Sequence, residues 1–487
     1  MTTSGVDASL RHGEALLHED LITPLHHHDE AHNRLLATVD GATRVVSPAQ
    51  ANELVTTLHP NRRIDDPGVE HVPNGPRFGR RGLFRGSLIG LGGLLAASAA
   101  PRYSFAAGSG GDTLVCIFLR GGFDGLAALG AVNDNYYHDL RGNVRVTGGL
   151  KLTSDYVLHN GFAALKGIWD DRQMAVVLGS GHPDVQRSHF EDQDLCERAA
   201  KANVRSGWIG RHIASSSSPS GTFRAITMGD QRVVLSLTTN AYQSLAMSNI
   251  ASFTLDGSWT EGDHAARLVT DLGRIYGDAG GVLETQARAT LDAVNSLAAL
   301  RKKIDARQAE PEHGATYNQD SDWHKGLQDT ARMIKADLGM EVACIDYGNW
   351  DMHQSIGQPT DKNGWFTRQA KDFATGLAAF RTDLGSKWNK VTVVTMSEFG
   401  RRVEVNGDGG TDHGHGNLMF LMGGGIKGGK VYGSMPELSP GNLEDGDVPI
   451  TTDYRQALSE IVQSRLNNPA IDQVFPGFTA SAPLGVA

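Results

Sequence analysis

The sequence predicts an α/β protein in which a mainly parallel central sheet lies between layers of helices. Apolar runs of five to seven residues recur along the chain, as expected of strands that are buried on both faces. Longer segments with helical periodicity lie between these runs. Each run ends at an abrupt change of polarity, where carboxylates, imidazoles or glycines follow.

The composition sets limits on the class of protein. The chain has 487 residues, 40% of them hydrophobic, which is enough for a large core. This length suits two or three domains, although α/β enzymes often extend this far as one. The net charge of −10 disfavours phosphate-backbone binding, so we expect no nucleic-acid partner. Three cysteines are too few for a disulfide framework.

The first 79 residues are polar and have little sustained periodicity, so we expect a poorly structured N-terminal extension over residues 1–79. The run His26-His27-His28 in this segment is either a solvated patch or a metal-binding cluster. The solvated patch is the interpretation that we favour.

Residues 80–107 have the layout of a twin-arginine signal segment. Arg80-Arg81 precede the uncharged apolar run Gly86–Ala100, and small residues follow at Ala106-Ala107. The run is too short for a stable membrane span, and a buried helix rich in glycine and alanine is the alternative. The prediction is export by the twin-arginine machinery to a periplasmic or extracellular location.

The main domain is expected over residues 112–487, and its first strand is Thr113–Leu119. A glycine-rich loop follows and contains Asp124. This carboxylate is either a metal ligand at the end of the strand or the N-cap of a helix over Leu126–Leu129.

A short helix is expected over Phe162–Trp169 and a second parallel strand over Met174–Leu178. Beyond it, Ser188 opens a helix that continues through Glu191–Ala200. Ser188 is either a cap or a nucleophile, because a helix N-terminus also stabilises an oxyanion or phosphate. Arg187 would supply a fixed cation beside it.

The middle of the chain alternates short strands with long helices. The expected elements are strands at Ala225–Met228, Val233–Leu237 and Glu341–Tyr347, and helices at Val282–Ile304 and Trp323–Leu338. Asp351 and His353 follow the last of these strands. Residues two apart in extended chain face the same side, so both side chains could bind one ion.

The helix Phe366–Leu384 leads into the strand Val391–Met396, which is followed by Glu398. A loop rich in glycine then brings Asp412, His413 and His415, before another strand at Leu418–Met422 and a last helix at Asp453–Arg465. Imidazoles with carboxylates are ligands for zinc, manganese or iron. A solvated loop with incidental histidines is the alternative.

Five motifs carry a resemblance to a known family. They are LRGGFDGL at Leu119–Leu126, RSHF at Arg187–Phe190, DMH at Asp351–His353, SEFGRR at Ser397–Arg402 and GTDHG at Gly410–Gly414. The chain resembles the exported family numbered 1501 among domains of unknown function, within the alkaline phosphatase and sulfatase superfamily. The resemblance extends from Asp112 to the C-terminus and implies an alkaline-phosphatase-like three-layer sandwich.

The resemblance also implies a site with two divalent metal ions, which could be zinc, manganese, calcium or magnesium. Glu398 stands where the superfamily has an Asp-His pair, so one imidazole ligand is missing there. Ser188 falls at the position of the nucleophile, and His415 is a possible substitute for His413. The metal ligands that the resemblance implies are Asp124, Asp351, His353, Glu398 and His413, with Asp412 beside the last of them.

The implied function is an exported metal-dependent hydrolase of a phosphate or sulfate ester, with a small-molecule or polymer substrate. Arg187 and Arg401 would neutralise the oxygens of the transferred group. The alternative is a non-catalytic, metal-stabilised exported binding protein that kept the fold.

Overall fold

The computed structural model describes residues 22–24, 35–39, 42–46 and 112–487, the last with gaps at 202, 218–220, 222, 243, 254–262, 277–290, 292, 296, 299, 303–308 and 481. The chain divides into two units, Met1–Arg80 and Arg81–Ala487, and each is described by itself. The predicted twin-arginine segment and the histidine cluster lie outside the described residues.

The first unit contains a small antiparallel sheet of three strands, β1 Ile22–Pro24, β2 Leu35–Val39 and β3 Ala42–Val46. The sequence analysis expected little regular structure here. Both β2 and β3 are rich in apolar and β-branched residues, and Asp40-Gly41 separates them in the sequence. An Asp-Gly pair between two such runs is a strong hairpin signal, and the analysis missed it.

The second unit is built on a nine-stranded sheet with the order β10-β9-β11-β4-β12-β13-β8-β14, and β15 also pairs with β8. Within this sheet of the described chain, β13 alone runs antiparallel to its neighbours. The strands are β4 Thr113–Leu119, β8 Met174–Gly181, β9 Ala225–Met228, β10 Leu245–Met247, β11 Val342–Tyr347, β12 Val391–Met396, β13 Asn417–Gly423, β14 Lys430–Tyr432 and β15 Thr452–Asp453.

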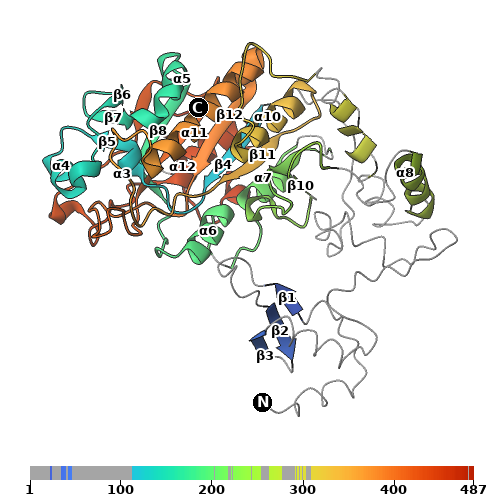
Figure 1. Cartoon of the computed structure of the whole chain (residues 1–487), viewed down its shortest axis with the longest axis horizontal. Helices are drawn as coiled ribbons and strands as arrows, with labels where there is room; N and C mark the ends of the chain where they lie inside the picture. The colour runs from blue at the N-terminus through green and yellow to red at the C-terminus, as the bar shows by residue number, and fades with distance from the viewer. Residues whose placement is uncertain are drawn as a thin grey trace. The chain divides into compact units, whose positions relative to one another are not determined.

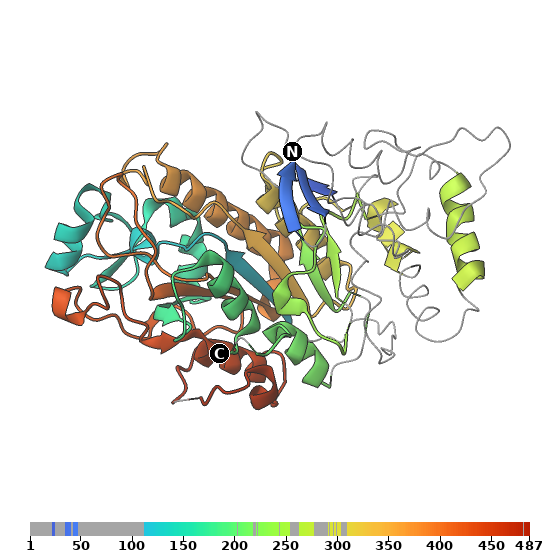
Figure 2. The ribbon, with the colours of Figure 1, turned by 90° about the horizontal axis from the view of Figure 1, so that it is seen from below.

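Helices cover both faces of this sheet (Figures 1 and 2). Alternate residues of β4 enter different cores, with Val115 and Ile117 on one face and Leu114 and Cys116 on the other. The first core is closed by α5 Lys166–Asp170, α10 Asp322–Lys335 and α11 Trp365–Leu384, and the second by α6 His189–Arg198, α7 Trp208–Ser215, α12 Tyr454–Ser464 and α13 Ile471–Val474. The predicted three-layer α/β fold with a mainly parallel sheet is confirmed.

Smaller elements complete the second unit. A second antiparallel sheet consists of β5 Leu129–Ala131, β6 Gly149–Lys151 and β7 Tyr156–His159. The remaining helices are α3 Gly125–Ala128, α4 Asn135–Arg141 and α8 Asp263–Tyr276, with 3₁₀ turns at Gly142–Val144, Asn160–Leu165, Leu235–Leu237, Gly385–Lys390 and Pro440–Asn442. None of the described helices combines the length and the hydropathy that a membrane span requires.

One predicted strand is wrong. The segment Val233–Leu237 has the composition of a strand but ends in the 3₁₀ turn Leu235–Leu237. There the backbone N–H and the hydroxyl of Ser236 both donate to the buried carboxylate of Glu197, at 2.8 and 3.0 Å. These bonds replace the backbone hydrogen bonds to a neighbouring strand that a strand would need.

The predicted helix Val282–Ile304 is helical at its described positions from 291 to 302.

The strands that run parallel place their carboxyl ends at one edge of the sheet. The segments that follow four of these strands therefore meet there. Asp124 follows β4, His189 follows β8, Asp351 follows β11 and Glu398 follows β12. In open α/β sheets this edge is where ligands bind.

Candidate metal centre

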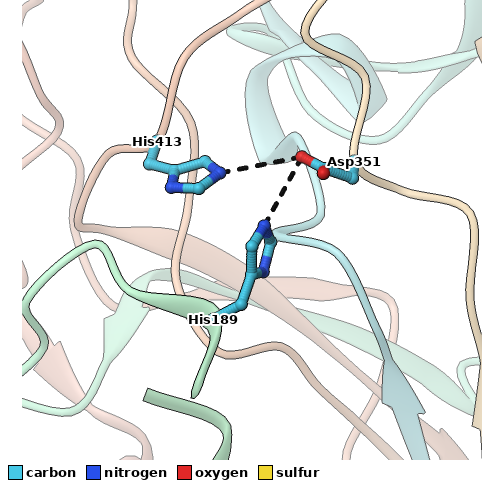
Figure 3. A group of neighbouring side chains, drawn as sticks. All are labelled: His189, Asp351 and His413. Atoms are coloured by element: carbon cyan, nitrogen blue, oxygen red, sulfur yellow. Dashed lines mark ion pairs between the residues drawn. The ribbon is translucent and has the colours of Figure 1, made fainter. Parts of the chain in front are cut away.

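Three side chains from separate segments of the chain meet at this edge (Figure 3). His189 is the first residue of α6, Asp351 follows β11, and His413 lies between β12 and β13. Each offers one ligand atom within 4.8 Å of the others. Both rings face the same carboxylate: Asp351 Oδ1 lies 3.5 Å from His189 Nε2 and 3.6 Å from His413 Nε2.

His353 brings a fourth ligand atom to this set. Its Nε2 lies 2.9 Å from His413 Nε2 and 3.0 Å from Asp351 Oδ1. Around a tetrahedral zinc ion with bonds of about 2.0–2.1 Å, neighbouring ligand atoms lie roughly 3.3 Å apart. His353 Nε2 is therefore spaced like a neighbouring ligand from His413 and Asp351, while the group in which every ligand atom lies within 4.8 Å of the others is His189, Asp351 and His413.

The second nitrogen of each ring contacts an oxygen that orients the ring. Each Nδ1 faces an oxygen that can only accept, and a neutral ring with its proton on Nδ1 would present the lone pair of Nε2 to a metal ion. The three pairs are His189 with Glu398 Oε1 at 2.9 Å, His353 with Asp412 Oδ1 at 3.3 Å, and His413 with the carbonyl oxygen of Arg187 at 2.8 Å.

Three imidazole Nε2 atoms thus converge on one carboxylate oxygen. The facing lone pairs of His353 and His413 repel at 2.9 Å unless a proton or a metal ion lies between them. His189 Nε2 is buried and has no hydrogen-bond partner among the described residues. This donor set fits a divalent transition metal, since imidazole ligands favour zinc, iron or manganese over calcium or magnesium.

Arg401 holds Asp351 in place. Its side chain is buried, and Nη2 lies 2.6 Å from Asp351 Oδ1. The same guanidinium donates to the carbonyls of Gly121, Gly122 and Thr411, so it ties the loops together. Burial raises the pKa of Asp351, but the hydrogen bond and charge of Arg401 outweigh burial and hold that pKa below its usual value. The carboxylate is therefore ionised and available to a cation.

The two less exposed imidazoles have pKa values shifted in opposite directions. The hydrogen bond to Glu398 raises the pKa of His189. Burial lowers the pKa of His413, and the charge of Arg401 acts in the same direction. Because protons and metal ions compete for Nε2, His189 is the ligand that is more readily lost to a proton as pH falls.

Glu398 was expected to bind metal directly, but the structure places it behind the ligands. Its side chain is fully buried, and Oε1 accepts hydrogen bonds from the Gly121 backbone N–H at 2.8 Å and from Gln193 at 3.0 Å, besides His189. These donors use the lone pairs that a metal would need. Glu398 orients the His189 ring instead.

Asp124 was also expected to bind metal, and it lies apart from the converging atoms. Its carboxylate accepts from the Ala127 N–H at 2.9 Å as the N-cap of α3, and from the Thr411 hydroxyl at 2.9 Å. Arg141 Nη1 lies 2.6 Å from it in a buried ion pair. With Asp124 and Glu398 both occupied, the described residues offer ligands for one cation where the resemblance implied two.

The other predicted residues surround the centre. Asp412 orients His353 and also accepts from Asn406 at 3.0 Å. The Arg187 side chain pairs with Asp445 through Nη1 and with Asp447 through Nη2, so both terminal nitrogens of its guanidinium are engaged.

Ser188 occupies the N-cap position of α6, but its side chain makes no cap hydrogen bond. Asp192 accepts from the Ser188 N–H at 2.9 Å and so holds the turn that precedes α6. Hydroxyl capping is therefore not the role of Ser188. His415 Nδ1 faces Glu444 and Asp447 at 3.4 and 3.5 Å, outside the set of converging nitrogens.

His189 is the member that the sequence analysis missed. The sequence pattern favoured Ser188 instead, because a serine at a helix start has a known catalytic use. The available signal was the imidazole at the next position, in a motif directly after a core strand. Its direction toward Asp351 depends on Glu398, 209 residues away, and that contact cannot be read from spacing.

The backbone is strained just before two of the ligands. Arg187 and Asn349 have φ angles of 63° and 67°, a region that non-glycine residues rarely adopt. Arg187 in this conformation directs its carbonyl to His413. Such strain is concentrated at functional sites, where the surrounding structure holds it in place.

Comparison with known proteins identifies one family. A family model described as "Protein of unknown function (DUF1501)" matches residues 174–454. No curated protein matches the sequence.

Two solved structures are distantly similar to the chain. The lipoteichoic acid synthase LtaP from Listeria monocytogenes is 10% identical over 69% of this chain and 71% of its own, with a TM-score of 0.26. The C-terminal periplasmic domain of EcEptC from Escherichia coli, solved in complex with Zn, is 10% identical over 67% of this chain and 77% of its own, with a TM-score of 0.27. Scores this low say nothing about the activity of this chain.

Proposed function

The chain belongs to the DUF1501 family, whose model covers more than half of its length, and from the site within that region we propose an exported, metal-dependent hydrolase of a phosphate or sulfate ester. The observation that carries the proposal is the convergence of the Nε2 atoms of three histidines on one carboxylate oxygen at the ligand-binding edge of the sheet. The motif resemblance to the alkaline phosphatase and sulfatase superfamily supplies the reaction type.

A divalent cation would be held by His189, Asp351, His353 and His413. Zinc, manganese or iron suits this set better than calcium or magnesium, which prefer oxygen ligands. When bound, such a cation supplies Lewis-acid polarisation of a phosphoryl or sulfuryl oxygen. The side chains of Asp351 and His353 are 50% and 43% exposed, so a substrate would approach from their side.

The residues around the cation keep the ligands fixed. Glu398 and Asp412 contact Nδ1 of His189 and His353, and Arg401 holds Asp351. Preorganised ligands of this kind need no rearrangement during the reaction.

Ser188 is the candidate nucleophile. Its hydroxyl is free of the capping role and lies at the N-terminus of α6, where developing negative charge is favoured. In the proposed reaction, Ser188 Oγ attacks phosphorus or sulfur and the bond from that atom to the ester oxygen breaks. The serine proton passes through water to the departing oxygen, which leaves as the alcohol. Water then hydrolyses the serine ester.

The test combines metal analysis with turnover. We expect about one transition-metal ion per chain by elemental analysis of protein exported by its native host, and a lower Tm after chelation, since ligand bound only by the folded state stabilises it. His189→Ala and Asp351→Ala should lose the ion and the chelator effect. His313→Ala, in an exposed histidine far along the chain from the motifs, is the control and should retain both.

Turnover of aryl phosphates and aryl sulfates then tests the reaction. Ser188→Ala should abolish turnover with no loss of stability, because the structure gives its side chain no cap bond to lose. Full activity of this variant would refute the nucleophile. Protein without bound metal and without a chelator effect would refute the metal-dependent function.

A second function follows from the number of ligands. Four protein ligands can complete a tetrahedron, and closed sites of this kind are structural. This favours a non-catalytic, metal-stabilised exported binding protein as the alternative. Stoichiometric metal together with no turnover of either ester class would select it.

A further inference from the structure

Two arginines beside the metal centre converge on one acidic hairpin. Residues Glu444 and Asp447 form its bridge, with backbone hydrogen bonds of 2.9 and 3.0 Å between them. Asp445 and Gly446 at the tip have φ angles of 54° and 88°, as a two-residue hairpin turn with positive φ at both positions requires. The tip is therefore a defined turn that presents Asp445 outward.

The hairpin places two carboxylates against two guanidinium groups. Asp447 is fully buried, and its Oδ2 lies 2.6 Å from Arg187 Nη2 while its Oδ1 lies 3.5 Å from Arg402 Nε. Asp445 Oδ2 lies 3.3 Å from Arg187 Nη1 and 3.9 Å from Arg402 Nη2, yet 82% of its side chain is exposed. One carboxylate is thus a fixed part of the cluster, and the other is held only from one side.

Both arginines are joined to the centre through their backbones. The Arg187 carbonyl accepts from His413 Nδ1 at 2.8 Å, and the Arg402 N–H donates to the Asp412 carbonyl at 2.9 Å. Arg187 Nε is buried and has no hydrogen-bond partner in the part of the chain that the structure describes. The pair therefore keeps unused donor capacity next to the ligands.

We propose that Arg187 and Arg402 form an anion subsite beside the metal centre, and that Asp445 occupies this subsite as an internal competitor. The ligand class is a tetrahedral oxyanion, such as a second phosphate or sulfate group of the substrate. The assignment of that group to a substrate rests on the proposed function.

The charges and the exposure of Asp445 support this assignment. When Asp445 turns away, two guanidinium groups remain with the single carboxylate of Asp447, which leaves one positive charge uncompensated. Guanidinium groups bind oxyanions with paired N–H donors. An exposed ion pair contributes little free energy, so displacement of Asp445 is easy.

The test is calorimetric titration of inorganic phosphate into the full chain, with and without chelator. Asp445→Asn should tighten the Kd for phosphate by roughly fivefold, about the limit for one exposed ion pair. Glu404→Gln is the matched control: it removes an exposed carboxylate two residues from Arg402, and the described structure gives it no ion pair. It should leave the Kd unchanged. Asp445→Asn combined with Arg402→Gln should lose the gained affinity.

The outcomes separate this inference from the proposed function. A gain in Asp445→Asn that persists in the chelated protein supports the subsite even if the chain turns over no ester. Three results would overturn the subsite, whatever the metal content and turnover prove to be. The affinity of Asp445→Asn for phosphate could be unchanged or lower, or Glu404→Gln could gain as much affinity. The gain of Asp445→Asn could also survive the addition of Arg402→Gln. Absence of measurable phosphate binding in both wild type and Asp445→Asn also overturns it.

Discussion

At the scale of single residues, the direction of each side chain decides whether it can bind a metal ion or only holds neighbouring groups in place. Asp124 and Asp351 both follow core strands at the same sheet edge, and both contact a buried arginine. Asp124 also caps α3 and accepts from Thr411, which fills its coordination, whereas Asp351 leaves Oδ1 facing three imidazoles. The same residue type at equivalent positions thus has two different roles.

The role of Asp124 can be tested by removing only its charge. Asp124→Asn keeps an acceptor for the Ala127 N–H but leaves the buried guanidinium of Arg141 unpaired. We expect the free energy of unfolding to fall by about 3–5 kcal/mol in denaturant titrations, the usual result of breaking a buried ion pair from one side. Metal content should stay at the wild-type level, while Asp351→Asn should lose it. Loss of metal at unchanged stability would show instead that Asp124 is a ligand.

At the scale of elements, the centre depends on loops that approach one another closely. The loop after β12 runs against the loop after β11, where a Cβ on Gly410 would lie 2.2 Å from the carbonyl carbon of His353. Only glycine allows this approach. The position of His353 relative to His413 is thus set by backbone packing as well as by the strands.

The glycine contact gives a matched pair of variants in one loop. Gly410→Ala should push the two loops apart, lower the metal affinity measured by competition with a chelating dye, and destabilise the fold by about 1–3 kcal/mol, as overpacking does. A Cβ on Gly407 would meet open space, so Gly407→Ala should change neither the metal affinity nor the stability. Equal effects in both variants would show that the loss comes from the alanine and not from the contact with His353.

At the scale of the whole molecule, a folded domain with a candidate metal centre follows a segment whose sequence predicts export. The nine-stranded sheet with its two helical layers begins only after residue 112. Twin-arginine export carries folded proteins, which suits a protein that would bind its metal before export. We expect residues 1–79 to contribute nothing to the mature fold, and this expectation stays a prediction.

Export can be tested through the arginine pair itself. Replacing Arg80 and Arg81 with lysine should leave the protein in the cytoplasm in cell fractionation, because the machinery recognises the arginines and not only their charge. Arg85→Lys, in the same segment but outside the pair, is the control and should be exported. Normal export of the double variant would contradict the twin-arginine interpretation.

The positions of the central strands and of the polar sheet edge could be predicted from the sequence. The apolar runs at Thr113–Leu119 and Val391–Met396 became β4 and β12 with the predicted bounds, because a strand buried on both faces must be apolar along its whole length. The order of strands and helices then fixed the sheet edge where polar loops gather. The spacing of Asp351 and His353 correctly placed two neighbouring side chains together.

Only the tertiary structure decided which side chains form the centre. His189 turns its Nε2 toward Asp351 because Glu398 holds its other nitrogen, and Glu398 is unavailable to a metal for the same reason. Asp124 is removed from the set by Arg141, a residue on another element. A ligand differs from a supporting residue by which donors lie within about 3 Å of its atoms, and those donors come from distant parts of the chain that a linear pattern does not bring together.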